Sequence, residues 1–208
     1  MAFKLSPRDI EKNSLVYDAM ASLGNPDFWF GNHKEKNYEK LVQIEEFTRA
    51  PLTGRKCLDI GCGTGDFSSF LRKIEISEYL GLDIYGPSLE FARRKFPHEL
   101  FLNLDILNWN TEEKFDYVFC SGALSTNIDS DNYKFIESAI AKMWELAGIG
   151  LSFNFLTEEM QWTDERIFHY STTRIIEICK NIINPEGRLF HRIIDGEAHI
   201  YIWKSKAI

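Results

Sequence analysis

The run KCLDIGCGTGDF, which extends from Lys56 to Phe67, constrains the fold more than any other stretch of this chain. An apolar segment leads into glycines at positions 61, 63 and 65, and a helix-like pattern follows them. Glycines at such a junction let the main chain turn tightly and approach a ligand at the N-terminus of the helix. The run therefore predicts a strand, a nucleotide-binding loop and a helix.

Short apolar runs alternate with helical patterns from Lys56 onward, which is typical of a parallel sheet covered by helices. The predicted strands are Lys56–Ile60, Tyr79–Ile84, Leu100–Asp105, Phe115–Ser121, Ile149–Leu156 and the runs GRLFHRII and HIYIWK. The predicted helices are Gly65–Ile74, Gly86–Phe96, Asp131–Ala147 and Thr172–Ile183. An Asp-Gly pair between the last two runs indicates an antiparallel hairpin. We therefore expect an α/β fold with a mostly parallel seven-stranded sheet and an antiparallel last strand.

Length and composition predict a single domain. The chain has 208 residues, of which 44% are hydrophobic, and this is enough for one sizeable core. We expect residues 1–208 to form one domain, in which an aromatic helical segment, 1–50, packs across one end of an α/β core, 51–208.

Charge and hydropathy argue against several classes of partner. The net charge of −7 and the pI of about 5.3 disfavour nucleic acid, whose binding normally needs a basic stripe. No stretch reaches the roughly 18 to 20 apolar residues of a membrane span, and the N-terminus has no signal-peptide core, which predicts a cytoplasmic protein. The cysteines form no C-x-x-C pair, so neither a metal site nor a disulfide is expected; they are Cys57, Cys62, Cys120 and Cys179.

Acidic residues around the glycine loop indicate which kind of nucleotide it holds. In a dinucleotide fingerprint the third small residue lets the helix approach a pyrophosphate, and here that position is Asp66. A carboxylate there repels a diphosphate. Asp59 stands before the first glycine, and Asp83 and Asp105 end the next two strands; the separation of 22 between Gly61 and Asp83 suits an acid that binds ribose hydroxyls. Together they predict a cation-bearing nucleoside.

With its loop LDIGCGTG, its two spaced acids and its closing hairpin, the sequence resembles the class I methyltransferases that use S-adenosylmethionine. The resemblance covers about 56–204 and implies a Rossmann-like, doubly wound sheet. It also implies that Asp83 holds the ribose hydroxyls and that Asp105 accepts from the adenine amine. The other implied cofactor contacts are Asp59, Gly61, Cys62, Gly63 and Gly65 around the methionine and ribose, Ile84 and Ile106 on the faces of the adenine, and Ser121 with Gly122 at the pocket floor.

The resemblance implies methyl transfer to an oxygen or nitrogen of a small-molecule acceptor. The stretch CSGALS lacks the Asn/Asp-Pro-Pro-aromatic turn of enzymes that methylate base amines. Because the reaction is an in-line displacement, the protein mainly holds the nucleophile near attack distance. We expect acceptor contacts from the insertions SGALSTNIDSDN and TEEMQWTDERIFHY and from the aromatic N-terminal segment, in a monomer or weak homodimer.

Particular aromatic and basic residues are candidates on this acceptor side. Tyr17 is expected to cover the cofactor, since an aromatic face near a sulfonium gains about 0.5–2 kcal/mol. Trp29, Trp162 and Tyr170 are expected to contact the acceptor. His169 is the candidate general base, which is needed only if the nucleophile arrives protonated.

Two alternatives from other classes stay open at this point. An NAD(P)-dependent oxidoreductase would share the glycines and Asp83, but Asp66 and the terminal hairpin count against it. A non-catalytic S-adenosylmethionine-binding protein would keep the same sheet and lose only the acceptor pocket.

Overall fold

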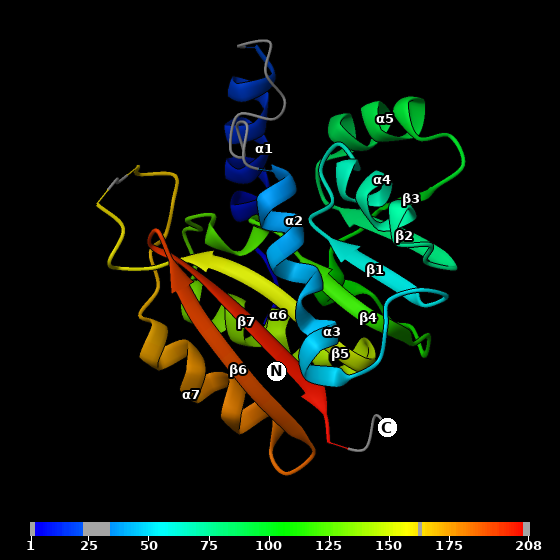
Figure 1. Cartoon of the computed structure of the whole chain (residues 1–208). Helices are drawn as coiled ribbons and strands as arrows, with labels where there is room; N and C mark the ends of the chain where they lie inside the picture. The colour runs from blue at the N-terminus through cyan, green and yellow to red at the C-terminus, as the bar shows by residue number, and fades with distance from the viewer. Residues whose placement is uncertain (1–2, 23–33, 162–163, 206–208) are drawn as a thin grey trace.

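Seven strands form one sheet, in the order β3-β2-β1-β4-β5-β7-β6, in the computed structural model, which describes residues 3–22, 34–161 and 164–205 (Figure 1). The strands are β1 Lys56–Ile60, β2 Glu78–Asp83, β3 Leu100–Asn103, β4 Phe115–Cys120, β5 Ala147–Leu156, β6 Gly187–Ile194 and β7 Glu197–Lys204. The helices are α1 Pro7–Ser22, α2 Lys34–Val42, α3 Ile44–Thr48, α4 Asp66–Lys73, α5 Gly86–Lys95, α6 Asn132–Leu146 and α7 Thr172–Ile183, with short 3-10 turns η2 Ile106–Asn108 and η3 Ala123–Ser125.

The pairing of the strands confirms the predicted α/β fold and its reversed last strand. β1 pairs in parallel with β2 on one side and β4 on the other, whereas β7 runs antiparallel to both β5 and β6. The hairpin turns at Asp195 and Gly196, whose φ angles of 53° and 78° are both left-handed. A two-residue turn of this kind requires positive φ at both positions, which explains why Asp-Gly marked it in the sequence.

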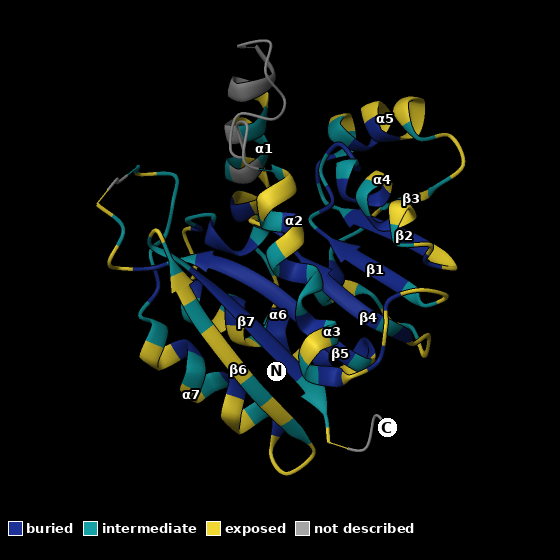
Figure 2. Ribbon diagram, in the orientation of Figure 1, coloured by how far each residue is buried: buried dark blue, intermediate teal, exposed yellow. Residues whose placement is uncertain are grey.

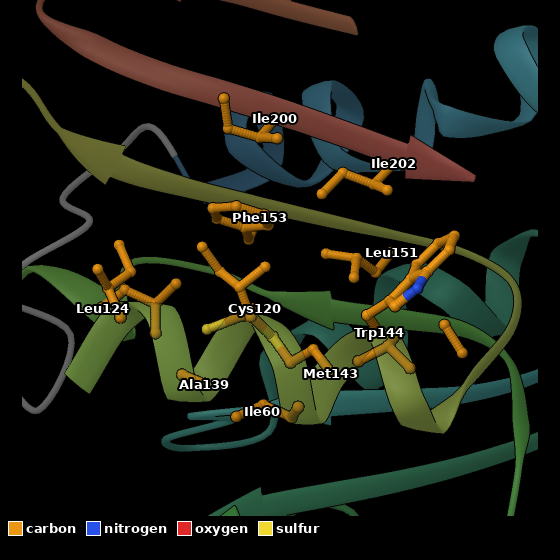
Figure 3. Packing of buried hydrophobic residues seen from close by; sticks show 14 of the residues in the cluster. Ile60, Cys120, Leu124, Ala139, Met143, Trp144, Leu151, Phe153, Ile200 and Ile202 are labelled. Carbon is orange, nitrogen blue, oxygen red and sulfur yellow. The ribbon is translucent and has the colours of Figure 1, made fainter. Parts of the chain in front are cut away.

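Two apolar clusters fill the two faces of the sheet. On one face, helix α6 places Met143 and Trp144 against strand residues that include Phe153 and Ile202 (Figure 3). On the other face, α2, α3, α4 and α5 cover a second cluster around Phe119. Figure 2 shows the central strands buried and the outer strand β6 partly exposed. This two-sided burial is why the central strands have nearly continuous apolar sequences.

Boundaries differ from the sequence prediction mainly where a strand gives way to a turn. β3 ends at Asn103 instead of Asp105, because the Asp105 carboxylate accepts a hydrogen bond from the Leu107 main-chain N–H (2.9 Å) and starts η2. α7 spans the range that was predicted for it. Within the described part of the chain, no helix is long and apolar enough to cross a membrane.

Candidate functional site

A pocket lies at the carboxyl edge of the sheet, beside the point where the strand order reverses between β1 and β4. Ligands of open α/β sheets bind at such a switch point because the connections leave in opposite directions there and open a crevice. β7 is antiparallel, so its first residue, Glu197, reaches the same edge as the last residues of the parallel strands. The predicted residues that line the pocket are Tyr17, Asp59, Gly61, Cys62, Gly63, Asp83, Ser121 and Gly122.

The glycine loop forms the pocket wall after β1. Gly61 has a φ of 70°, and a Cβ there would lie 2.2 Å from the Cβ of Ala123, so only glycine fits. Gly63 has a φ of 52°, and a Cβ there would meet nothing within 4 Å because the pocket is open at this point. The conformation of the loop therefore requires glycine, and the missing side chain at Gly63 leaves room for a ligand against the main chain.

The carboxylate of Asp83 is held in place by this loop. Its two oxygens accept hydrogen bonds from the main-chain N–H groups of Gly63 (2.8 Å) and Tyr85 (2.8 Å). Burial raises the pKa of Asp83, and these two donors oppose the rise. A half-buried, oriented carboxylate that lines the pocket retains lone pairs for the two hydroxyls of a ribose. The residues present thus fit a nucleoside cofactor.

Asp59 supplies a second carboxyl group deeper in the pocket. It is 2% exposed and accepts a hydrogen bond from the Tyr79 hydroxyl (2.7 Å). Burial raises the pKa of Asp59 to about 7, and the neighbouring Asp83 adds to the rise. The group therefore titrates near neutral pH, which no feature of the sequence indicated.

The negative charge of Asp66, at the start of α4, is compensated by neighbouring side chains. Its carboxylate accepts from Lys95 Nζ (2.5 Å), Lys34 Nζ (3.1 Å) and the Thr64 hydroxyl (2.6 Å). Two cations thus offset its negative charge. The repulsion of a diphosphate predicted for Asp66 is therefore weakened by Lys34 and Lys95, which come from helices outside the loop motif.

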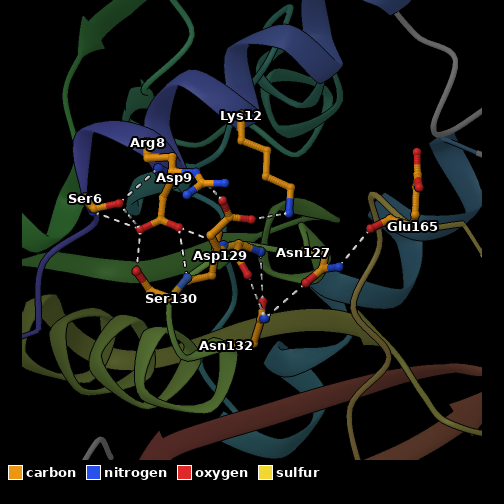
Figure 4. A network of polar contacts seen from close by, with 10 residues as sticks. Ser6, Arg8, Asp9, Lys12, Asn127, Asp129, Ser130, Asn132 and Glu165 are labelled. Carbon is orange, nitrogen blue, oxygen red and sulfur yellow. Dashed lines mark hydrogen bonds and ion pairs between the residues drawn. The ribbon is translucent and has the colours of Figure 1, made fainter.

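Helix α1 is fastened beside the pocket by the buried carboxylate of Asp9 (Figure 4). Asp9 accepts from the main-chain N–H groups of Asp129 (2.8 Å) and Ser130 (3.1 Å) and from the hydroxyls of Ser130 (2.6 Å) and Ser6 (2.6 Å). Burial tends to raise the pKa of Asp9, but these hydrogen bonds outweigh it and hold the pKa well below its usual range. We call these contacts the Asp9 latch.

The latch positions Tyr17, further along the same helix. Tyr17 lines the pocket, and its ring stacks on Tyr85 with centroids 5.2 Å apart. The Tyr85 hydroxyl donates in turn to Asp18. Burial raises the pKa of the Tyr17 hydroxyl, and the Asp83 carboxylate adds to it. Helix α1 is thus tied both to the loop before α6 and to Tyr85, two residues beyond the second strand.

Beyond β4 the pocket continues over β5 and β7. Phe155 and Leu156 line it from the end of β5, and Glu197 lines it from the start of β7. A short antiparallel bridge between Thr126 and Ile167 brings two chain segments together at the wall. The sequence predicted these two segments here, but not which of their residues line the pocket. No feature of the sequence indicates a site role for Glu197, because this residue lies in a hairpin with no recognisable motif.

Several predicted site residues lie elsewhere among the described residues. Asp105 caps η2, Ile106 belongs to the core, and neither they nor Ile84 and Gly65 line the pocket. The adenine contacts therefore stay predictions.

The predicted acceptor contacts also differ in their placement. Tyr170 is fully buried, and its hydroxyl donates to the main-chain oxygens of Leu124 (3.1 Å) and Asn132 (3.3 Å), so it packs in the core instead of facing the pocket. His169 does not line the pocket, and its Nε2 is buried without a hydrogen-bond partner. Trp29 and Trp162 lie outside the described residues.

Comparison with known proteins finds methyltransferases. The family model of a methyltransferase domain matches residues 58–148. Trans-aconitate 2-methyltransferase from Escherichia coli O1:K1 is 33% identical over 67 residues, which are 32% of this chain and 27% of that relative. This chain spans about a third or less of the length of the curated relatives that it matches.

Solved structures match over nearly the whole chain. The complex of DhpI with S-adenosylhomocysteine has a TM-score of 0.70 at 18% identity and covers 97% of this chain and 99% of its own. The N-methyltransferase NodS from Bradyrhizobium japonicum, also with S-adenosylhomocysteine, has a TM-score of 0.68 at 16% identity, covering 95% and 99%. At these identities the likeness concerns the fold.

Strand order, glycine loop and pocket together define a Rossmann-like methyltransferase domain. Residues 58–148 match a methyltransferase-domain model, and the chain has the fold of the class I methyltransferases that use S-adenosylmethionine.

Proposed function

We propose that this chain transfers a methyl group from S-adenosylmethionine to a nitrogen or oxygen of a small-molecule acceptor. One observation carries the proposal: the pocket does not end at the glycine loop and Asp83 but continues to walls built by β5, β7 and the Thr126–Ile167 bridge. A protein that only stored the cofactor would have no need of that second compartment.

The chain's own residues perform binding and orientation. Asp83 and the main chain of the glycine loop hold the nucleoside, and Tyr17 covers it from α1. The cofactor supplies an activated methyl group when bound, so catalysis rests mainly on holding the acceptor in line with that methyl. A small molecule is favoured over nucleic acid because the net charge is −7. The name of the curated relative from Escherichia coli also indicates a small-molecule acceptor.

Calorimetry tests the proposal directly. S-adenosylmethionine and S-adenosylhomocysteine should bind with micromolar affinity, and NAD should bind at least about tenfold more weakly, a difference of 1.4 kcal/mol. Tighter binding of NAD would favour an oxidoreductase instead. Binding of S-adenosylhomocysteine without methylation of any compound in a broad panel of amines, phenols and carboxylic acids would favour a non-catalytic protein.

A further inference from the structure

The acceptor side of the pocket is built around the carboxylate of Glu197. Its side chain is 16% exposed, and the residue lines the pocket at the start of β7. The Oε1 atom accepts a hydrogen bond from Asn154 Nδ2 (2.7 Å), and Asn154 Oδ1 accepts in turn from the main-chain N–H of Gly122 (2.7 Å). Both the NH2 group and the oxygen of the Asn154 amide thus form hydrogen bonds. Asn154 is thereby fixed to Gly122 at the pocket and in turn orients Glu197.

A histidine stands directly behind this carboxylate. His199 lies two residues along β7, pairs with Asn154 in the sheet register and is fully buried. Its Nε2 lies 2.9 Å from Glu197 Oε2, yet neither ring nitrogen has a hydrogen bond of suitable geometry. Buried polar groups normally have partners, so an imidazole left in this state beside a pocket carboxylate calls for an explanation.

Glu197 also differs from Asp66 in how closely cations compensate its charge. Among the charged residues that line the described pocket, Lys34 pairs with Asp66 (3.1 Å), and Arg166 pairs with Asp164 through two nitrogens. Glu197 Oε2 lies 3.8 Å from Lys40 Nζ, which is longer than a hydrogen bond, and 2.9 Å from His199 Nε2, which is a cation only when it is protonated. The acceptor compartment therefore carries a carboxylate that is weakly compensated.

We infer that this compartment takes a small amine as its acceptor and that Glu197 is the residue that binds the amine nitrogen. The inference rests on the proposed methyltransferase function. A carboxylate oriented in a partly buried wall attracts an ammonium and disfavours a carboxylate ligand. Phe155, Leu156 and Ile167 line the same compartment and suit an apolar body attached to that amine.

The same arrangement gives the proton a destination. An ammonium cannot attack, so Glu197 first accepts one proton from it. The free amine nitrogen then bonds to the methyl carbon while the carbon–sulfur bond breaks, and the sulfur keeps the electron pair. The proton stays on the Glu197 carboxylate, whose Oε2 lies 2.9 Å from His199 Nε2. Of these two residues, only Glu197 touches the acceptor.

Three probes of equal size test the inference: benzylamine, benzyl alcohol and benzoate, each titrated into protein saturated with S-adenosylhomocysteine and followed by ligand-observed NMR. Benzylamine should bind at least about tenfold more tightly than benzoate, a difference of 1.4 kcal/mol. Glu197→Gln keeps the side-chain shape and an oxygen for Asn154, and should abolish that preference. Glu90→Gln, which removes one charge from the exposed face of α5, is the matched control and should retain it.

Titration of S-adenosylhomocysteine into each variant separates the possible failures. Its affinity should change less than about twofold in Glu197→Gln, which also shows that this variant is folded. Benzoate binding as well as benzylamine, or a preference that survives Glu197→Gln, would overturn the amine inference and leave the methyltransferase proposal standing. Absence of S-adenosylhomocysteine binding in the unmodified chain would overturn both.

Discussion

The two halves of the pocket are built in different ways. Over β1 and β2, the wall is built around main-chain groups and the Asp83 carboxylate, which the N–H groups of Gly63 and Tyr85 hold at 2.8 Å. Over β5 and β7, the wall includes side chains such as Glu197, which is oriented by Asn154 from the neighbouring strand. The first half requires glycine geometry that many sequences can supply. The second half depends on particular side chains, so we expect it to be the half that determines which acceptor is chosen.

The largest effect is expected from a substitution in the first half of the pocket, Asp83→Ala. Asp83→Ala removes the carboxylate that we propose accepts from the ribose hydroxyls, and each such charge-assisted hydrogen bond contributes about 1.5–3 kcal/mol before desolvation. Calorimetry should show affinity for S-adenosylhomocysteine reduced at least about tenfold. Glu197→Gln, from the other half, serves as the comparison and should keep that affinity. Normal cofactor binding by the Asp83→Ala protein would mean that the ribose is held elsewhere.

A smaller effect is expected from the latch that covers the first half. Asp9→Asn keeps the shape of the side chain but removes the charge that five donors share, and should lower the free energy of unfolding by about 2 kcal/mol. Cofactor affinity should fall about threefold, because α1 and Tyr17 are held less firmly. Denaturant titration and calorimetry measure the two quantities.

Lys12→Ala is the control for this variant. It removes a surface ion pair with Asp129 (2.8 Å) and should change stability by less than about 1 kcal/mol. Equal effects of the two variants would show that the latch contributes no more than its surface charges.

The pH dependence of stability sharpens the comparison further. Because burial raises the pKa of Asp59 from 3.8 to about 7, the folded state keeps a proton that the unfolded chain releases. Stability should therefore fall as pH rises from about 4 through 7. Asp59→Asn should remove this part of the slope, which denaturant titrations at pH 5, 6.5 and 8 would detect.

Asp66→Asn is the matched control for that series. The pKa of Asp66 is lowered, so its contribution to stability is present above the unfolded value of 3.8 and is lost only below it. The slope between pH 5 and 8 should be unchanged in this variant. A slope that persists in Asp59→Asn would place its origin in another group.

The smallest effect is expected at His169. The sequence made it the candidate general base, but its ring does not line the pocket whereas Glu197 does. His169→Gln should therefore change the rate at which the protein methylates an amine substrate by less than about threefold. A loss of a hundredfold or more, which is the usual contribution of a general base, would return that role to His169.

The part of this molecule that was predictable from sequence is the part that depends on neighbours in the chain. The glycine loop, the hairpin at Asp195 and Gly196, and helix α7 each follow from residues a few positions apart. Glu197 and Asn154 could not be recognised in this way, because their roles depend on strands that meet only in the folded sheet. Likewise, Ser6 and Asp9 form a local capping pair, and nothing near them indicates a second role at Ser130.

The Asp9 latch also has a consequence for how the chain matures. Asp9 and its main-chain donor Asp129 are 120 positions apart, although they form one hydrogen bond. During synthesis the N-terminal helix is made first, and its partner loop leaves the ribosome only after the glycine loop and four strands have been translated. Contacts of such long sequence separation form late in folding, since closing the intervening loop costs entropy that only the rest of the fold repays. We therefore expect a nascent chain to form the glycine loop and its nucleoside site before α1 packs beside them. Tight cofactor binding should then develop only after α1 has docked.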